Sequence, residues 1–464
     1  MAPLRLSGYL EAERERILAT LEEWLRIPSI SSAPEHAADV ARSAAFCAYL
    51  LRDAGLERVE VVGAHGAPAV FGEWRHAGPG APTLVVYGHH DVQPVDPLEL
   101  WHSPPFEPVV VDGELRARGA IDDNCQFLYD IEAVRGLLAT EGSLPVNLVF
   151  FIEGEEEVGS PSMEALLAAE AERLRCDAVV VSDTTMVAPD VPSTCVGMRG
   201  LVAFDVAVRT AAADLHSGLF GGAVPNSAHV LARLVAALHD DDGRVTLPGF
   251  YDRVRPPTAA EATSMAALPF DEAAWMRAAG VERLEGEAGH STLERIGARP
   301  TAEVTCIGVG YAGEGIKTIV PATGHAKVTF RLVADQDPTD VAEAFHAWVA
   351  ERIPEGVEVT LTPHGAVAPA LTPVEHPAVG ALSRAIERVW GTPPLLTREG
   401  GSGPEEALGR ILGAPVLFLG VGLPDDRFHA PNERLVLDQL WRGLLAAGEL
   451  WAELAAVDWP VARR

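Results

Sequence analysis

Histidines and carboxylates that could bind metal ions gather in a few short stretches of this 464-residue chain. One stretch, residues 88–94, reads GHHDVQP. Residues two apart on an extended segment point the same way. His89 could therefore bind a metal through one ring nitrogen while Asp91 orients the ring through the other. The stretch is equally compatible with a polar strand end, so it does not decide the question alone.

Two further stretches are rich in carboxylates. Residues 118–123 read RGAIDD, where Asp122 could bridge two metals because a carboxylate has two oxygens. A loop with two solvated acids is the alternative. Residues 153–160 read EGEEEVGS, and glutamates this close repel one another unless cations or solvent neutralise them. One of them could be a metal ligand and its neighbour a general base. The alternative, a solvated acidic loop, fits poorly directly after an apolar strand.

Asp183 and His429 complete the candidate donor set, although each is a weak signal alone. Two histidines with three carboxylates offer the nitrogen and oxygen donors that a pair of zinc-like ions prefers. The cysteines take no part, because they are odd in number, scattered and free of any CxxC pair. That pattern predicts reduced, mostly buried thiols without a disulfide framework.

Four short, continuously apolar runs must position these donors. Such runs are typical of strands with both faces covered, in a parallel or mixed sheet flanked by helices. Each run is followed by candidate residues, and in open α/β sheets sites form beyond the carboxyl ends of the strands. The sequence therefore predicts a three-layer α/β/α unit with one shared site. The runs are residues 83–87, 146–152, 178–181 and 416–419.

The segment between residues 200 and 365 has a different pattern. Its candidate strands alternate polar and apolar residues, as in a sheet with one wet face. Two helices are expected, the second from Pro338 to Ile353 with Asp337 or Asp340 as its cap. The order strand, helix, strand, strand, helix, strand suits a ferredoxin-like layer. The strands are expected at 202–208, 303–309, 327–333 and 357–361, with an Ala-rich helical insertion at 241–300.

This change of pattern predicts a smaller domain inserted between two parts of a metal-binding domain. A chain of this length exceeds what one ordinary core holds. The expected division is residues 1–199 for the first part of the catalytic domain, 200–365 for the inserted domain, and 366–464 for the second part.

Composition and charge exclude several classes of partner. Hydrophobic residues make up 48% and charged residues 22% of the chain, as in globular proteins. No apolar run approaches the roughly 18 residues of a membrane span. The acidic stretch from Tyr9 to Leu25 lacks the features of a secretory signal, so a cytoplasmic location is expected. The net charge of −30 repels phosphate backbones, which argues against nucleic-acid binding.

The sequence resembles the zinc peptidase family that includes carnosine dipeptidases, aminoacylases, succinyl-diaminopimelate desuccinylase and carboxypeptidase G. It most resembles the cytosolic non-specific (carnosine) dipeptidase branch, nearly from end to end. The ordered matches are GHHDVQP (88–94), RGAIDD (118–123), EGEEEVGS (153–160), VSD (181–183), DLHSG (214–218), GIKTIVP (315–321), REGGS (398–402) and His429 with Asn432-Glu433.

The resemblance implies a role for each metal-binding candidate. His89 and Asp183 would hold one ion, Glu157 and His429 the other, and Asp122 would bridge both. Zn²⁺ is the expected ion, and Mn²⁺ or Co²⁺ suits similar ligands. Two ions about 3.5–4 Å apart can polarise the scissile carbonyl and lower the pKa of a bridging water.

Neighbouring residues receive roles from the same resemblance. Glu156 would be the general base that takes a proton from water and passes it to the leaving amine. Asp91 would support His89, and a cis peptide would join Asp122 to Asp123.

One departure from the family pattern lies beside the bridging aspartate. Relatives usually carry Lys-Gly after the paired aspartates, whereas this chain has Asn124-Cys125. The change could alter metal preference or substrate scope. Cys125 is interpreted as a small filler beside the site rather than as a ligand.

The inserted domain would be a lid and dimerisation domain. His216 would reach the partner's active site in a homodimer and stabilise the oxyanion of the tetrahedral intermediate, with Thr318 from the same partner. Within the subunit, Arg331, His364 and Ser402 would contact substrate, and the planar guanidinium of Arg331 suits a terminal carboxylate. By sequence alone, Arg331 could also be a surface arginine and His364 a strand-end cap.

The implied activity is hydrolysis of the amide bond of dipeptides or similar small substrates. An N-acyl or N-carbamoyl amino acid hydrolase on the same scaffold is the runner-up, because the metal ligands do not separate the two. The GIKTIVP and REGGS runs favour the dipeptidase branch by likeness. A third interpretation, a binding protein that lost catalysis, predicts missing ligands or a missing base, and all are present.

Overall fold

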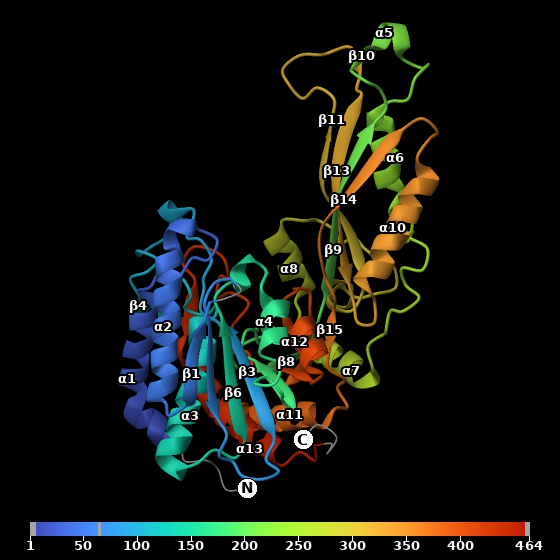
Figure 1. Ribbon diagram of the computed structural model, residues 1–464. Coiled ribbons are helices and arrows are strands. Elements are labelled where there is room, and N and C mark those ends of the chain that lie inside the picture. The colour runs from blue at the N-terminus through green and yellow to red at the C-terminus, as the bar shows by residue number, and fades with distance from the viewer. Residues whose placement is uncertain (1–5, 64–65, 460–464) are drawn as a thin grey trace.

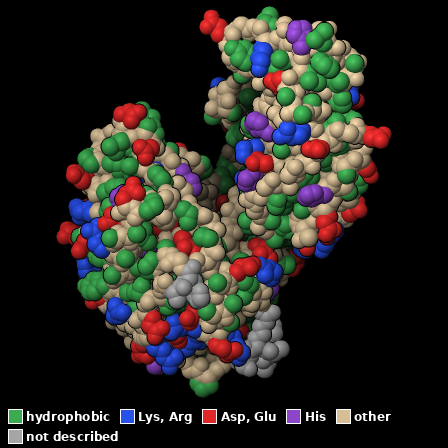
Figure 2. All heavy atoms as spheres, turned by 45° about the horizontal axis from the view of Figure 1, so that its top comes forward, with side chains coloured by type: hydrophobic (Ala, Val, Ile, Leu, Met, Phe, Trp, Pro, Cys, Tyr) green, Lys and Arg blue, Asp and Glu red, His purple; other side chains and the backbone are tan. Residues whose placement is uncertain are grey.

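The computed structural model describes residues 6–63 and 66–459, which form two lobes (Figure 1). The larger lobe contains both ends of the described chain, and the smaller lobe comprises residues 200–367. A space-filling view shows a hollow between the lobes (Figure 2). The division into domains at residues 200 and 365 stays a prediction, because a domain is a unit that can fold alone.

A six-stranded sheet forms the centre of the larger lobe. The four predicted apolar runs are neighbouring strands of this sheet and pair in parallel. Two antiparallel strands that the sequence did not reveal extend one edge. The strand order is β1 (Glu57–Val62), β2 (Ala69–Trp74), β6 (Asn147–Glu153), β3 (Thr83–His89), β7 (Ala178–Val181) and β17 (Val416–Phe418).

Helices cover both faces of this sheet, which confirms the predicted three layers (Figure 1). In β3, Leu84 and Val86 belong to one hydrophobic core and Val85 and Tyr87 to the other, because alternate side chains of a strand point to opposite faces. The first core packs against α1 (Leu6–Leu25), α2 (Ala37–Asp53), α3 (Asn124–Glu141), α11 (Pro377–Trp390) and α13 (Leu437–Ala455). The second packs against α4 (Met163–Ala169) and α12 (Glu405–Leu412).

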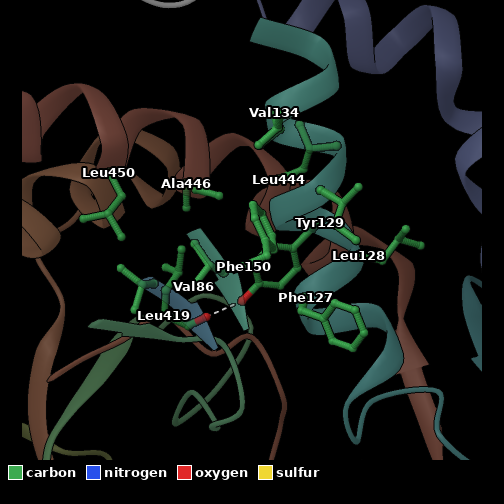
Figure 3. Packing of buried hydrophobic residues seen from close by; sticks show 14 of the residues in the cluster. Val86, Phe127, Leu128, Tyr129, Val134, Phe150, Leu419, Leu444, Ala446 and Leu450 are labelled. Atoms are coloured by element: carbon green, nitrogen blue, oxygen red, sulfur yellow. Dashed lines mark hydrogen bonds between the residues drawn. The ribbon is translucent and has the colours of Figure 1, made fainter. Parts of the chain in front are cut away.

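The position of α3 is fixed by dense packing on the first of these cores (Figure 3). Tyr129 lies between the sheet residues Val86 and Phe150 and the α13 residue Leu444 (Figure 3). Its buried hydroxyl donates a hydrogen bond to the backbone carbonyl of Leu419, directly after β17. This contact matters for the site, because α3 begins immediately after the paired aspartates of the RGAIDD stretch.

The smaller lobe has its own core and a four-stranded antiparallel sheet. The sheet order is β11 (Thr301–Val309), β13 (Thr323–Leu332), β9 (Gly200–Arg209) and β14 (Glu358–Val367). Two helices, α6 (Ser227–Ala237) and α10 (Pro338–Arg352), pack against this core. Chain order and sheet order together confirm the ferredoxin-like arrangement. Of the two candidate caps for α10, Asp337 is the one used: its Oδ1 accepts from the Thr339 amide at 2.7 Å.

The predicted helical insertion is present as three short helices, two of which contact the larger lobe. Arg398 donates from Nε to Glu261 Oε1 at 2.7 Å, and both side chains are almost fully buried. The helices are α7 (Ala259–Ala267), α8 (Glu272–Ala279) and α9 (Thr292–Gly297), and α7 and α9 pack on β16 (Leu395–Glu399). The insertion therefore connects the two lobes.

Three small sheets complete the fold, and one of them lies at the end of the smaller lobe that is remote from the larger lobe (Figure 1). They consist of β10 (Leu215–His216) with β12 (Ile319–Val320); β15 (Ala370–Leu371), β8 (Ser193–Met198) and β16; and β18 (Arg434–Val436), β5 (Glu114–Arg116) and β4 (Val109–Val111). The five cysteines are free, and all except Cys306 are buried, as predicted. Within the described ranges, no helix has the length and apolarity that a membrane crossing requires.

Candidate metal centre

The carboxyl ends of β3 and β7 bring His89 and Asp183 together with Asp122, which lies in the loop just before α3. His89 is the last residue of β3 and is fully buried. Its Nε2 lies 3.1 Å from Asp122 Oδ1 and 3.4 Å from Asp183 Oδ2. These atoms surround a point where a cation could bind, because one ligand atom from each residue lies within 4.8 Å of the others.

A second group shares Asp122 with the first. The Nε2 atom of His429 lies 3.0 Å from Asp122 Oδ2 and 3.2 Å from Glu157 Oε2. Each oxygen of Asp122 therefore faces a different histidine, which is the arrangement that a carboxylate bridging two ions requires. The backbone of His429 has a φ of 55°, a left-handed conformation that is costly for a residue other than glycine and that occurs often at functional sites.

Charges in this cluster balance one another internally. Although burial opposes its ionisation, hydrogen bonds from His429 and His89 hold the pKa of Asp122 well below its usual range. Hydrogen bonds to Asp122 and Glu157 raise the pKa of His429 to about 10. Metal ligands of these types bind as neutral imidazole and ionised carboxylate. Bound divalent cations would therefore neutralise the carboxylates in place of the protons on the two histidines.

Glu156 lies beside the ligands but outside both groups. Burial raises its pKa to about 9, and the carboxylates of Asp183, Asp122 and Glu157 contribute to that rise while His89 opposes it. Cations bound in the two groups would favour the ionised form of Glu156, because opposite charge nearby stabilises a carboxylate. The position therefore suits a general base that works only in the metal-loaded protein.

Asp91 orients its neighbours in two ways. The Nδ1 atom of His89 lies 3.0 Å from the backbone carbonyl oxygen of Asp91 and 3.4 Å from the carboxylate. The main chain of Asp91 is thus the nearer partner, a detail that the residue spacing could not reveal. The carboxylate accepts hydrogen bonds from the amides of Glu156 and Glu157 at 3.2 and 3.1 Å. One residue therefore positions two candidate ligands, His89 and Glu157, and the candidate base Glu156.

The expected cis peptide between Asp122 and Asp123 is present. Asp123 is fully buried, and its Oδ2 accepts from the His89 amide at 3.2 Å. Asn124 and Cys125 are also buried in the first turn of α3, and Cys125 belongs to neither metal group. Burial raises the pKa of the Cys125 thiol well above its usual value, which supports its interpretation as a neutral filler.

Glu433 is a residue whose role the sequence analysis missed. Its fully buried carboxylate pairs with Arg118 Nη1 at 2.7 Å. It also accepts from the amides of Gly119, Ile121 and Asp122 at 3.0, 2.9 and 3.2 Å. The loop that carries Asp122, the residue shared by both donor groups, is therefore held by a side chain only four positions after His429. The matched Asn432-Glu433 pair was the available signal, but its partners are main-chain groups that no side-chain pattern reveals.

We expect Glu433→Gln to weaken metal binding without removing any ligand. The amide would place an NH₂ group where backbone N–H donors point, and the loop holding Asp122 would shift. Residues that support ligands typically contribute a factor of about 10–100 in metal affinity or activity. The metal concentration for half-maximal activity should rise by that factor, and excess metal should restore much of the turnover.

Asp425→Asn is the matched control, because Asp425 lies in the same segment but is exposed. Thermal unfolding of both variants separates a local effect from general destabilisation. An unchanged metal requirement in Glu433→Gln would contradict the positioning role.

A pocket of about 720 Å³ between the lobes gives access to the metal centre. Its wall includes Glu156, Glu157 and Ser402, and His429 enters it with 56% of its side chain exposed. Gln93 also lines the pocket and donates to Glu157 Oε2 at 2.7 Å. A small substrate in this pocket can therefore reach the candidate base together with Glu157 and His429, two members of the second donor group.

Two predicted substrate-binding residues meet at the base of the smaller lobe. Arg331 Nη1 donates to Ser402 Oγ at 3.0 Å, and Ser402 donates to the carbonyl of Arg199. His364 lies elsewhere: its Nε2 is 2.7 Å from Asp205 Oδ2, and it does not line the pocket at the metal centre. The structure thus brings Ser402 and Arg331 together, while substrate contact by His364 stays a prediction.

His216 and Thr318 lie at the remote end of the smaller lobe, in the two-stranded β10–β12 region (Figure 1). The amide of Ser217 donates to the Thr318 carbonyl at 3.0 Å, and the exposed His216 ring accepts from the Gly218 amide. Neither residue lines the pocket at the metal centre of its own chain. Their predicted action on a partner subunit is not tested by a single chain.

Comparison with known proteins gives consistent results. The sequence model of "Peptidase family M20/M25/M40" matches residues 85–453. The human Beta-Ala-His dipeptidase is 29% identical over 448 residues, covering 92% of this chain and 88% of the relative. The Cys-Gly metallodipeptidase of Schizosaccharomyces pombe is 28% identical over 470 residues, covering 98% of each. Among solved structures, the M20 family metallo-carboxypeptidase of Sulfolobus solfataricus is 30% identical, with a TM-score of 0.83, over 95% of this chain and 99% of that one.

Proposed function

Because the chain belongs to peptidase family M20/M25/M40, we propose that this metallopeptidase hydrolyses dipeptides with the help of two divalent metal ions. The observation that carries the proposal is the pair of donor groups that share Asp122. Glu156 lies beside them and lines the same pocket as Glu157 and His429. The names of relatives point to the substrate class, since Beta-Ala-His and Cys-Gly are both dipeptides.

We assign the ligands as two sets with one shared member. His89 and Asp183 would hold one ion, Glu157 and His429 the other, and Asp122 would contact both. Nitrogen and carboxylate donors in this number favour Zn²⁺, and Mn²⁺ or Co²⁺ could bind the same set. The ions would polarise the scissile carbonyl and make water a stronger nucleophile at neutral pH.

The protein's own groups would then direct the proton and the substrate. The Glu156 carboxylate would accept the proton of the attacking water and donate it to the leaving amine. The Asp91 carboxylate would keep Glu156 in place by accepting a hydrogen bond from the Glu156 backbone amide. Glu156 lines the pocket at the metal centre, so a substrate in that pocket would be able to reach its carboxylate.

A cationic pair at the base of the smaller lobe is suited to the terminal carboxylate of a dipeptide. Burial and the positive charge of Arg331 lower the pKa of Arg199 to about 10. Two guanidinium groups this close are stabilised by an anion, and a guanidinium can bind a carboxylate through two hydrogen bonds. We therefore assign Arg331, with Ser402 as its hydrogen-bond partner, to recognition of the substrate carboxylate.

A homodimer through the remote end of the smaller lobe would supply His216 and Thr318 to the partner's site. Large apolar side chains are exposed beside them: Ile316 is 93% exposed and Leu219 is 78% exposed. Exposed apolar patches of this kind are typical of interaction surfaces. His216 would donate a hydrogen bond to the oxyanion of the partner's reaction, which is among the strongest contributions a single group makes to catalysis.

A substrate panel tests the proposed function. The metal-loaded protein should hydrolyse free dipeptides much faster than N-acetyl, N-succinyl or N-carbamoyl amino acids, because both relatives named above act on dipeptides. Product amino acids are measured by chromatography at equal substrate concentrations. Turnover confined to the acylated compounds would overturn the dipeptidase assignment in favour of a deacylase.

A carboxypeptidase is the second candidate, because the solved structure at 30% identity is a metallo-carboxypeptidase. A carboxypeptidase accepts further residues or a blocking group on the amino-terminal side of the cleaved bond, whereas a dipeptidase does not. Tripeptides and N-blocked dipeptides in the same panel separate them. Release of a carboxyl-terminal residue from those compounds, at rates equal to those for free dipeptides, would favour the carboxypeptidase.

A further inference from the structure

A second pocket, of about 740 Å³, lies between the helical insertion and the larger lobe. One wall comes from α8 and the residues around it, including Leu268, Phe270 and Trp275. The opposite wall includes Met186 and Val187, which follow β7. Trp275 remains 39% exposed although its ring lies 6.3 Å from that of Phe270. The pocket therefore offers apolar and aromatic surface that no other part of the described chain covers.

This apolar pocket adjoins the metal centre on its Asp183 side. Thr185, two residues after Asp183, lines it, and the Thr185 amide donates to the carboxylate of Glu399, which also lines it. Glu399 in turn is close enough to Asp183 for their charges to interact. The pocket further includes Arg199, whose carbonyl accepts the hydrogen bond from Ser402. The wall of the pocket thus includes residues that neighbour the candidate ligand Asp183 and the proposed carboxylate-binding groups.

The two sides of the metal centre differ in chemistry. The pocket on the side of Glu157 and His429 has several charged residues in its wall, Glu164 and Arg410 among them. The wall on the Asp183 side is formed mainly by aliphatic and aromatic side chains. A substrate that spans the metal ions would therefore have polar surroundings on one side and apolar surroundings on the other.

The apolar wall is held firmly in position. Glu261, at the start of α7, forms the buried ion pair with Arg398 and closes a capping box with Thr258. Ser264 Oγ accepts from the Leu396 amide at 2.7 Å. These contacts fasten the insertion to β16, directly before the pocket-lining residues Glu399 and Gly400. A fastened wall can select a side chain by shape, because its own conformation is already determined.

We propose that this pocket binds a bulky aliphatic or aromatic side chain of the substrate, so that the enzyme prefers dipeptides with such a residue. The proposal rests on the proposed function for the identity of the reaction. It goes further in naming the preferred substrates and in making residues 241–300 the segment that determines the preference.

The test is a side-chain series with variants that enlarge or fill the pocket. In the native protein, kcat/KM for the better of Leu-Gly and Gly-Leu should exceed that for Gly-Gly by a factor of about 10 or more, because burial of an aliphatic side chain is worth that much. Trp275→Ala should remove most of this advantage, because kcat/KM should fall far more for the leucine-containing dipeptide than for Gly-Gly. Ala274→Leu, which fills the pocket from α8, should do the same by steric exclusion.

Tyr49→Ala is the control, because Tyr49 is a 56% exposed aromatic residue on α2, outside the pocket. Equal kcat/KM for Leu-containing and glycine-only dipeptides, or an advantage that both pocket variants retain, would overturn the proposal while leaving dipeptide hydrolysis intact.

A measurement of binding makes the test independent of the reaction. Titration calorimetry with the slow Glu156→Gln variant compares Leu-Leu with Gly-Gly, and the affinity difference should be lost when Trp275→Ala is added. The same side chains are also assayed as N-acetyl amino acids. If dipeptides were not hydrolysed at all, the proposed function would fail, while calorimetry would still support or overturn the pocket.

Discussion

Replacing Glu156 with glutamine is expected to reduce kcat by a factor of about 10²–10⁴, the usual contribution of a positioned general base. Glutamine has nearly the same shape but cannot accept the proton of the attacking water. Metal content should be unchanged, because Glu156 belongs to neither donor group. The steric environment should also be unchanged, since the backbone amide of residue 156 would still donate to Asp91.

The measurement combines steady-state kinetics with metal analysis of the purified variant. Glu172→Gln serves as the control, because Glu172 is an acidic residue of the same lobe whose side chain is 87% exposed and pairs with a surface arginine. A Glu156→Gln protein with normal metal content and normal turnover would refute the role of base. A variant that had lost metal would show instead that Glu156 acts on the ions.

Mixing two inactive variants is expected to restore activity if His216 serves the partner subunit. His216→Ala keeps Glu156, and Glu156→Ala keeps His216, so each hybrid dimer would contain one complete active site. With random exchange of subunits, about one quarter of the native activity should return, because half of the dimers are hybrids with one working site of two. Each variant alone should show only a small fraction of native turnover, as expected when an oxyanion donor or the base is lost.

Subunit exchange must be verified independently, for example with two fluorescent labels. His346→Ala is a suitable control, because His346 is an exposed histidine on α10 of the same lobe and should leave native activity in place. Exchange without recovery would exclude action in trans. If the His216→Ala variant alone had native turnover, the histidine would contribute nothing to the reaction.

The sequence was most informative where the structure depends on local pattern. The four apolar runs proved to be neighbouring parallel strands, because a strand covered on both faces leaves a continuous signature that no amphipathic element imitates. The ligands follow those strands directly, so finding the strands placed His89 and Asp183 at the same edge. The order of elements between residues 200 and 365 predicted the ferredoxin-like sheet for a similar reason.

What could not be predicted depends on contacts between distant segments. Glu433 binds backbone amides more than 300 positions earlier in the chain, and backbone groups carry no sequence signal. The packing of the insertion on β16 depends on one buried pair, Arg398 with Glu261, either of which looks like a surface residue in isolation. The contact of the His364 ring with Asp205 across neighbouring strands likewise left no local signal, and the assignment of His364 to substrate binding stays a prediction.

The strand β17 at the edge of the central sheet has a consequence for how the chain is assembled. β7 pairs with β3 on one side and with β17 on the other, and β17 begins only at Val416. Until the ribosome has released that segment, the apolar β7 has an unpaired edge, and unpaired edges promote association with other chains. The same late segment brings His429 and Glu433, so a nascent chain cannot complete the proposed metal-binding set before this segment has been synthesised. Protection of the β7 edge and acquisition of metal would therefore depend on the same segment of the chain.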